Sequence, residues 1–220
     1  MKIAVLGTGS VGQAFATRLS GLGHDVTLGT RDVAKTSEKL ADYLSKNPTV
    51  KLATFADAAA ICDMALNVSK GENSLDVIAQ AGEKKLANKI LIDISNPLDF
   101  SHGMPPGLIP ALSNFTSLGE EIQKKIPASF VVKTLNTMWN GLMINPAQLN
   151  NGDHVNYICG NDEAAKTKVK SFLNELGWKN ESIVDLGDLS SARATEATLP
   201  IWLRVYGVKK TGAFNFKIIS

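Results

Sequence analysis

The chain has 220 residues, of which 44% are hydrophobic and 20% are charged, and its formal net charge is +2. This balance is ordinary for a globular protein, and the length allows one large domain or one domain with a small appendage. The lysines are mixed with acidic residues and form no basic stripe, which argues against a nucleic-acid partner. No run reaches the roughly 18 apolar residues that a membrane span requires. We therefore expect neither a nucleic-acid nor a membrane partner.

The two cysteines and the first residues indicate the compartment. Cys62 and Cys159 lie far apart and have no Cys or His at metal-ligand spacing, so we expect inert core thiols and neither a disulfide framework nor a metal site. The apolar segment after Met1 is too short for the hydrophobic region of a signal peptide. These observations predict a cytoplasmic protein.

Short apolar runs alternate with amphipathic helical runs along the first two thirds of the chain. The pattern predicts strands at 3–6, 26–28, 50–53, 64–68, 90–94 and 130–135, and helices at 10–22, 34–44, 75–85 and 115–125. Strands that are apolar throughout suit a parallel sheet covered on both faces. We therefore predict an α/β fold of the Rossmann type, a doubly wound parallel sheet.

Two long segments follow strands and are rich in Pro and Gly or other turn residues. Residues 96–113 cannot be regular structure on this reading, and residues 136–152 form the second segment. We place a domain boundary near residue 150, so that 1–150 is the Rossmann domain and 151–220 is a small α/β C-terminal region that completes the substrate cleft.

The C-terminal region has its own pattern. It predicts strands at 155–159 and 183–186 and helices at 163–176 and 191–206, the second perturbed by Pro200. Residues 214–219 are also strand-like. If they lie at a sheet edge they would favour pairing of two copies, so a homodimer stays open.

A glycine motif lies between the first strand and the first helix. The residues Gly7, Thr8, Gly9, Ser10, Val11 and Gly12 fit the pattern G-x-G-x-x-G. The first glycine permits a tight turn, the second lets a pyrophosphate approach the backbone, and the third allows close helix–strand packing. The helix N-terminus offers N–H groups to the phosphates. This motif predicts a dinucleotide cofactor.

The end of the second strand indicates which dinucleotide binds. NAD-binding chains usually carry an acidic residue there for the ribose hydroxyls, whereas this chain has Thr30 and Arg31, with Lys35 one helical turn later. These cations favour the 2′-phosphate of NADP(H). The alternative is that Arg31 is solvated and that Asp32 binds the ribose of NAD.

Polar residues end three further strands. Asn67, Val68 and Ser69 close one strand, Asn96 and Pro97 follow the next, and Asn136 follows the last strand of the predicted Rossmann domain. Ligands of doubly wound sheets bind outside the carboxyl ends of the strands, so these residues could hold the nicotinamide and its ribose. The alternative is that each one only starts a turn.

The sequence carries no recognisable catalytic acid, base or nucleophile. The three histidines follow no such pattern, and only His102 lies in a candidate loop. Lys133 lies on a strand directly after two valines and is interpreted as a rim residue without a role. Trp139 could wall a pocket, whereas Trp202 is interpreted as a packing residue. We assign no catalytic residue.

These motifs together resemble the NADPH-dependent coenzyme F420 (deazaflavin) reductase family, which is itself similar to the NADPH domain of transmembrane ferric reductases. The resemblance covers nearly the whole chain. It rests on the glycine motif, on Thr30-Arg31 with Lys35, and on the segments 93–98, 131–136, 160–162 and 185–187. It implies a Rossmann fold, NADP(H) as cofactor, and direct hydride transfer between the nicotinamide and a flavin or deazaflavin ring stacked in the cleft.

The second substrate stays open at this point. Residues 69–73 lack the apolar side chains expected beside a deazaflavin, and the anionic tail of coenzyme F420 would have only a loose basic set, Arg193, Arg204, Lys209 and Lys210. A flavin or quinone-like acceptor is an alternative. Two other functions remain: an NADP(H)-binding redox sensor without turnover, and a dehydrogenase of small hydroxy acids or imines.

Overall fold

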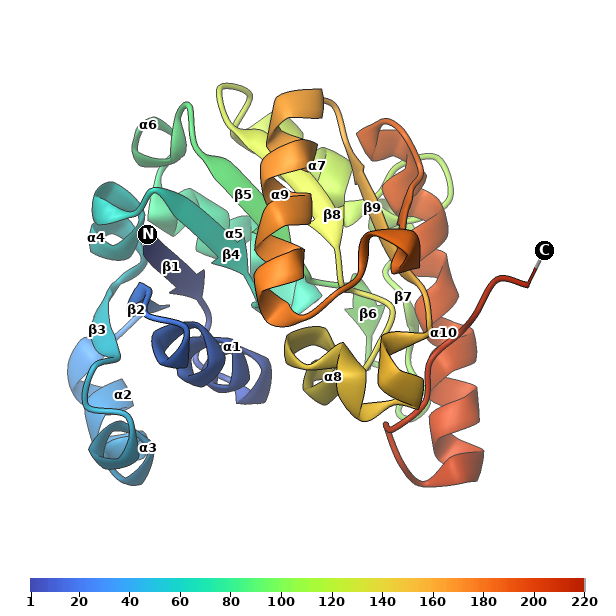
Figure 1. Ribbon diagram of the computed structural model, residues 1–220. Helices are drawn as coiled ribbons and strands as arrows, with labels where there is room; N and C mark the ends of the chain where they lie inside the picture. Colours follow the sequence, from blue (N-terminus) through green and yellow to red (C-terminus); the bar gives the residue numbers. More distant parts are fainter. Residues whose placement is uncertain (220) are drawn as a thin grey trace.

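The computed structural model describes residues 1–219, and its main sheet has eight strands (Figure 1). The strands are β1 (Lys2–Leu6), β2 (Asp25–Thr30), β3 (Lys51–Thr54), β4 (Met64–Asn67), β5 (Ile90–Asp93), β8 (Phe130–Thr134), β9 (Asn156–Gly160) and β10 (Ile183–Asp185). Their order across the sheet is β10-β9-β8-β5-β4-β1-β2-β3. The strand order reverses between β1 and β4, the place where a doubly wound sheet opens a crevice for a ligand.

The six strands from β3 to β8 are parallel, which confirms the predicted Rossmann arrangement. The C-terminal region adds two strands to this sheet: β9 runs antiparallel to β8, and β10 is parallel to β9. The C-terminal region thus extends the same sheet across the boundary that we place near residue 150. The division into two domains stays a prediction.

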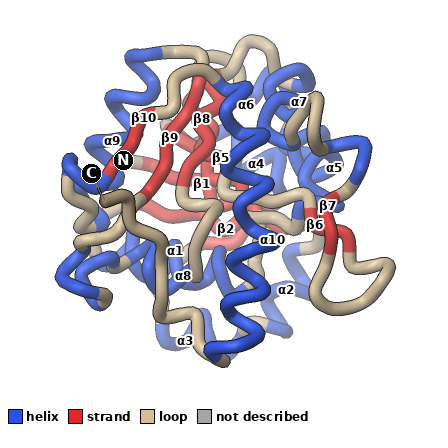
Figure 2. The backbone as a smooth tube through the Cα atoms, turned by 90° about the vertical axis from the view of Figure 1, so that its right-hand side faces the viewer, coloured by secondary structure: helices blue, strands red, loops and turns tan. Residues whose placement is uncertain are grey.

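Helices cover both faces of the sheet (Figures 1 and 2). One face carries α1 (Ser10–Gly21), α8 (Asn140–Ile144) and α9 (Glu163–Leu176); the other carries α4 (Phe55–Ile61), α5 (Gly71–Ala81), α6 (Glu83–Leu86) and α7 (Leu118–Lys125). The helices α2 (Val33–Lys39) and α3 (Ala41–Lys46) connect β2 to β3. Phe15 and Phe172 are fully buried on the first face, and Ile78 and Ile122 on the second. Each side chain of this kind contributes about 1.5–3 kcal/mol of burial free energy.

Several predicted elements differ from the structure in detail. The helix expected at 34–44 is split into α2 and α3, and that at 75–85 into α5 and α6. Residues 96–113 are not wholly irregular, because β6 (Leu98–Asp99) and β7 (Gly107–Leu108) form a small antiparallel hairpin. The helix α4 was not predicted. Thr54 begins it as an N-cap that accepts a hydrogen bond from the Asp57 N–H at 3.1 Å.

The last helix and the tail after it pack against other parts of the molecule. The helix α10 (Ala192–Lys209) continues through Pro200 and lies beside β7 on the outside of the molecule (Figure 2). The strand expected at 214–219 is not formed. Instead the tail passes the start of β9, where the Val155 N–H donates to the Phe216 carbonyl at 3.0 Å. The edge-strand argument for a homodimer therefore loses its basis.

No helix within residues 1–219 has the length and apolar character needed to cross a bilayer.

Candidate functional site

The glycine motif forms the turn from β1 into α1. Gly7 has φ +133°, a conformation that side chains disfavour, and its N–H donates to the Gly29 carbonyl of β2 at 3.2 Å. A Cβ atom on Gly12 would overlap the Gly7 carbonyl oxygen. The loop and the helix therefore meet backbone to backbone, as the sequence predicted for the first and third glycines.

Gly9 differs from the other two glycines because it faces open space. Nothing lies within 4 Å of the position where its Cβ would be. The helix α1 begins directly after it without a side-chain cap, and the first turn holds no acidic residue. An anion can therefore reach the N-terminal N–H groups and the positive end of the helix dipole. Thr8 precedes Gly9 in this turn, and Ser10 and Val11 are the first two residues of α1.

The end of β2 lies next to this turn, because Gly29 is hydrogen-bonded to Gly7. Thr30 is buried, and its hydroxyl contacts that of Thr36 at 2.7 Å. Arg31 is exposed, and Lys35 extends from α2 with its side chain 84% exposed. Both cations are thus open to solvent on the segment that follows β2, outside the main cavity.

Two of the predicted residues bind each other across the carboxyl ends of β5 and β8. The Asn96 amide donates to the Asn136 carbonyl at 2.8 Å, and the Asn136 amide donates to the Asn96 side-chain oxygen at 2.9 Å. Leu135 precedes this pair with φ +62°, a strained conformation for a bulky residue. Its N–H donates to Asn156 Oδ1 at 3.1 Å, which holds the turn.

Asn67 does not reach the cavity, although we predicted it as a cofactor-binding residue. Its side chain is fully buried, and its amide donates to Asp93 at 2.9 Å and to Ser95 at 3.2 Å. Its side-chain oxygen accepts from the Ser69 hydroxyl at 2.6 Å. Asn67 thus supports Ser69 from behind. Pro97 is also buried and lies outside the cavity lining.

A cavity of about 520 Å³ opens at these strand ends, within the range of cofactor and substrate sites. It is lined by seven residues that the sequence predicted: Gly9, Ser10, Val11, Val68, Ser69, Asn96 and Asn136. Gly7, Thr8 and Gly12 lie behind the lining and shape the turn. The cavity is thus continuous with the candidate pyrophosphate turn.

The opposite wall is apolar and was not predicted as part of the site. It consists of Leu98 and Phe100 from the hairpin region, Met138 and Met143 near α8, and Leu199, Trp202 and Leu203 from α10. Residues 69–73 lack apolar side chains, but these other segments, which are distant in the sequence, provide an apolar wall to the same cavity. No spacing in the sequence indicates that α10 returns to this place.

Trp202 belongs to this wall and also packs, so its interpretation as a packing residue was incomplete. Its ring stacks on Tyr206 and on Phe214 with centroid separations of 5.5 and 5.0 Å. Its indole N–H has no hydrogen-bond partner within residues 1–219. The position of the Trp202 ring is therefore set by these two stacking contacts and by the position of α10, and not by a hydrogen bond. Trp139, the residue that we considered for a pocket wall, is 39% exposed and lies outside the cavity lining.

Lys133 is not a rim residue, contrary to the prediction, because its side chain is fully buried. The ammonium group lies 2.8 Å from Asp93 Oδ2 and 2.7 Å from Glu196 Oε1. Burial alone would lower the pKa of Lys133, but the two carboxylates outweigh it and raise the pKa. Burial raises the pKa of Glu196, and the negative charge of Asp93 adds to this rise, while Lys133 opposes it. This ion cluster lies directly under the cavity.

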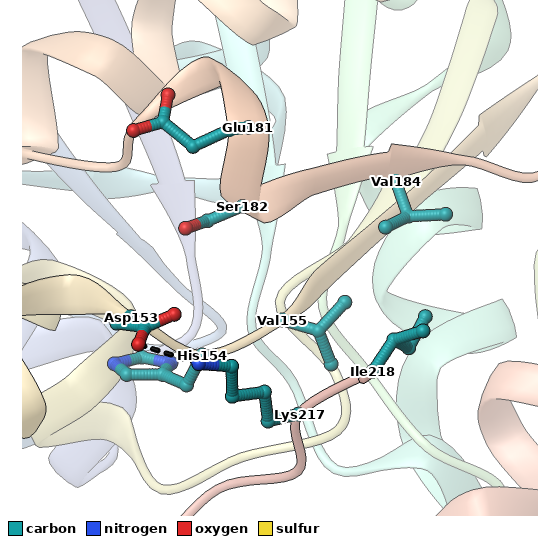
Figure 3. Close-up of a pocket in the computed structure, with 8 residues that line it drawn as sticks. All are labelled: Asp153, His154, Val155, Glu181, Ser182, Val184, Lys217 and Ile218. Carbon is teal, nitrogen blue, oxygen red and sulfur yellow. Dashed lines mark hydrogen bonds and ion pairs between the residues drawn. The ribbon is translucent and has the colours of Figure 1, made fainter. Parts of the chain in front are cut away.

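A second cavity, of about 70 Å³, lies between the C-terminal tail and the β9–β10 edge (Figure 3). Lys217 of the tail forms an ion pair with Asp153, and His154 is buried, with one ring nitrogen 3.0 Å from the Pro146 carbonyl. This cavity is too small for a cofactor and is separate from the glycine turn. Within residues 1–219, no group of three or more His, Cys, Asp or Glu side chains could hold a metal ion.

The fold and this geometry define a class of protein: a Rossmann-type dinucleotide-binding protein with an apolar cavity at the carboxyl edge of its sheet. Residues 2–97 match the family model described as NADP oxidoreductase, coenzyme F420-dependent. A candidate F420-dependent NADP reductase of known structure, from Arthrobacter sp. FB24, is 48% identical over the full length of both chains, with a TM-score of 0.95. The chain belongs to this family of NADP(H)-dependent oxidoreductases.

Two curated relatives are similar over part of their length. Metalloreductase STEAP3 of Rattus norvegicus is 28% identical over 91% of this chain and 38% of its own length. The F420-dependent NADP reductase of Methanothermobacter thermautotrophicus is 33% identical over 45% of this chain and 44% of its own. The chain thus spans less than half the length of these relatives. An imine reductase from Myxococcus stipitatus shares the fold at 20% identity, with a TM-score of 0.64 over 96% of this chain and 64% of its own.

Proposed function

We propose that the protein is an NADPH-dependent oxidoreductase that transfers a hydride between NADP(H) and a flavin, a deazaflavin such as coenzyme F420, or a similar aromatic acceptor. The observation that carries this proposal is the continuity of one cavity from Gly9 to Trp202. A polar, glycine-lined end and an apolar, aromatic end suit two ring systems placed face to face. When bound, NADPH supplies the hydride, which carries both electrons.

In this proposal each group of residues has one task. Gly7 to Gly12 bind the pyrophosphate, and Thr30, Arg31 and Lys35 surround the 2′-phosphate. Val68, Ser69, Asn96 and Asn136 face the nicotinamide end, with Asn67 and Pro97 supporting them. The apolar wall excludes water and orients the acceptor. Direct transfer between two rings depends on orientation more than on a protein acid or base, so the proposal needs no catalytic residue.

The C-terminal region, residues 151–220, completes the cleft in this proposal because α10 contributes Leu199, Trp202 and Leu203 to the wall. The basic residues that we considered for the anionic tail of coenzyme F420 do not favour this acceptor over the others. Arg193 is already engaged with Glu120 through two hydrogen bonds of 2.6 and 2.9 Å, and neither Arg204 nor Lys209 lines the cavity. Because the substrates are small dissolved molecules used together with NADPH, we place the reaction in the cytoplasm.

The experiment is an anaerobic turnover assay with NADPH deuterated at the transferable position. Riboflavin, FMN, coenzyme F420 and a water-soluble quinone serve as acceptors, and mass spectrometry follows deuterium into the reduced product. For acceptors that receive the hydride at carbon, retained label is expected. For flavins and quinones, whose new N–H or O–H exchanges with water, NADPH oxidation matched by acceptor reduction is the readout. Tight NADPH binding without turnover of any acceptor would instead support a redox sensor, and turnover of imines or hydroxy acids alone would support a dehydrogenase.

A further inference from the structure

The ion cluster under the cavity joins elements that are distant in the sequence. Lys133 of β8 binds Asp93 of β5 and Glu196 of α10, and all three side chains are at most 2% exposed. The Glu196 carboxylate also accepts the backbone N–H groups of Leu118 and Gly119 at 2.9 and 3.1 Å. These are the first residues of α7, whose positive dipole end offsets part of the second buried negative charge. The cluster thus connects four elements, β5, β8, α7 and α10, and each of its three charged groups has hydrogen-bonding partners.

On one side the cluster holds the polar floor of the cavity. The Lys133 ammonium donates to the Ser95 carbonyl at 2.5 Å, and Asp93 Oδ1 accepts from the Ser95 hydroxyl at 2.6 Å. The same Asp93 oxygen accepts from Asn67, which in turn supports Ser69. Ser95 and Ser69 both line the cavity. Moving Lys133 or Asp93 would therefore move the floor.

On the other side the cluster holds the apolar wall. Glu196 lies on α10, and Leu199 and Leu203 follow it at spacings of three and seven residues, which place them on the same face of the helix. Both leucines line the cavity, and Trp202 lies beside them. The residue that binds Lys133 thus shares a helix face with the residues that face the acceptor.

We propose that Lys133 and Glu196 are positioning residues, which fix α10 against the strand ends and thereby set the width of the cavity in which the acceptor ring lies. The inference rests on the proposed function, in which the acceptor occupies the cavity beside Trp202. Apolar side chains of similar volume would often stabilise such a junction as well as a buried ion cluster does. They would not fix its register, because apolar contacts are non-directional, whereas ion pairs and hydrogen bonds have set lengths.

The test is the substitution Glu196→Gln, which keeps the volume and removes the charge, and whose single side-chain oxygen can accept one of the two N–H groups of α7. It leaves Lys133 and Asp93 as a balanced pair. The expected result is a rise in the KM for the acceptor of about 5-fold or more, with kcat and the Kd for NADPH within about 2-fold of the wild type. Glu196→Asp, which keeps the charge but shortens the reach, is expected to shift the KM in the same direction and serves as the second variant if Glu196→Gln does not fold.

The matched control is Glu120→Gln. It breaks the partly exposed ion pair with Arg193 that also joins α7 to α10, but at the surface and away from the cavity. It is expected to leave all three constants unchanged. If Glu120→Gln raises the acceptor KM as much as Glu196→Gln does, loosening of α10 in general explains the effect and the proposal fails.

A readout independent of activity separates this inference from the proposed function. Protein labelled with 5-fluorotryptophan gives separate ¹⁹F signals for Trp139, Trp178 and Trp202, which single Trp→Phe variants assign. Glu196→Gln is expected to shift the Trp202 signal and to leave that of buried Trp178 in place. An unmoved Trp202 signal overturns the inference, whereas absence of turnover in the wild type overturns only the proposed function.

Discussion

The Asp32 carboxylate accepts the backbone N–H of Lys35 at 3.0 Å, and its other oxygen lies 3.6 Å from the Lys35 ammonium. Asp32 is thus the N-cap of α2. A cap of this kind stabilises a helix by about 1 kcal/mol. This stabilisation of α2 would be lost if the Asp32 side chain rotated away to bind a ribose. The arrangement therefore disfavours the alternative in which Asp32 binds NAD.

The first prediction concerns Arg31, which lies beside this cap and is exposed. Arg31→Ala is expected to raise the Kd for NADPH by about 10- to 100-fold, because a charge-assisted contact to a phosphate contributes about 1.5–3 kcal/mol. The Kd for NADH should stay within about 2-fold of the wild type. Titration followed by nicotinamide fluorescence measures both constants. Lys39→Ala, a charge removal farther along α2, is the control, and equal effects of the two substitutions would contradict a specific contact.

The second prediction separates two glycines of one motif. Gly9→Ala should leave the melting temperature nearly unchanged, because the new methyl group meets open space, and should weaken NADPH binding where the pyrophosphate approaches. Gly12→Ala should destabilise the fold by about 1–3 kcal/mol or more, because the methyl group overlaps the Gly7 carbonyl.

Thermal unfolding and NADPH titration of both variants provide the check. Gly21→Ala is the control, since nothing lies within 4 Å of its Cβ position at the end of α1. A stable Gly12→Ala protein with normal binding would show that the close approach of loop and helix is dispensable.

The third prediction uses two exposed phenylalanines. Phe100 lines the cavity and is 46% exposed, whereas Phe115 is 93% exposed and lies outside the lining. Phe100→Ala should raise the KM for an aromatic acceptor by about 2- to 10-fold, because an aromatic pair contributes about 0.5–1.5 kcal/mol. Phe115→Ala should leave it unchanged. Steady-state kinetics at saturating NADPH measure the KM for the acceptor in both variants. Equal KM values for Phe100→Ala and Phe115→Ala would mean that the acceptor does not bind beside Phe100.

Much of the fold could be predicted because its signals are local. The glycine motif, the apolar strands and the α9 boundaries at Glu163 and Leu176 all follow from periodicity and from turn residues. The helix α4 was missed although a local signal exists, since Thr54 and Asp57 form a capping pair. The antiparallel β9 could not be predicted, because strand direction depends on how the connection crosses the sheet.

The site divides in the same way. Its polar half could be predicted, because Asn96 and Asn136 each follow a strand, and the carboxyl ends of parallel strands meet at one edge. The apolar wall could not, because the position of Trp202 depends on where α10 packs. The prediction of Lys133 as a rim residue was wrong for a related reason. Its partner Glu196 comes from α10, and no sequence pattern near Lys133 indicates that this ion pair forms.

The last prediction concerns acid stability. Burial alone would raise the pKa of Asp185, but hydrogen bonds from Lys170 and Lys166 lower it to about 2 from its ordinary value of 3.8. Because the folded-state pKa is the lower one, this carboxylate stabilises the protein above about pH 4 and loses its contribution as the pH falls toward 2. The side chain is 26% exposed and Lys170 is 36% exposed, so solvent screening reduces the contribution to about 1 kcal/mol.

Asp185→Asn should therefore lower the free energy of unfolding by about 1 kcal/mol near pH 6 and by almost nothing near pH 2. Urea unfolding across this range measures the difference. Asp76→Asn is the control, because Asp76 is exposed and forms no ion pair in the part of the chain that the structure describes. A constant difference between wild type and Asp185→Asn at every pH would mean that the substitution acts through packing, since an electrostatic contribution must vanish once the carboxylate is protonated in both the folded and the unfolded state.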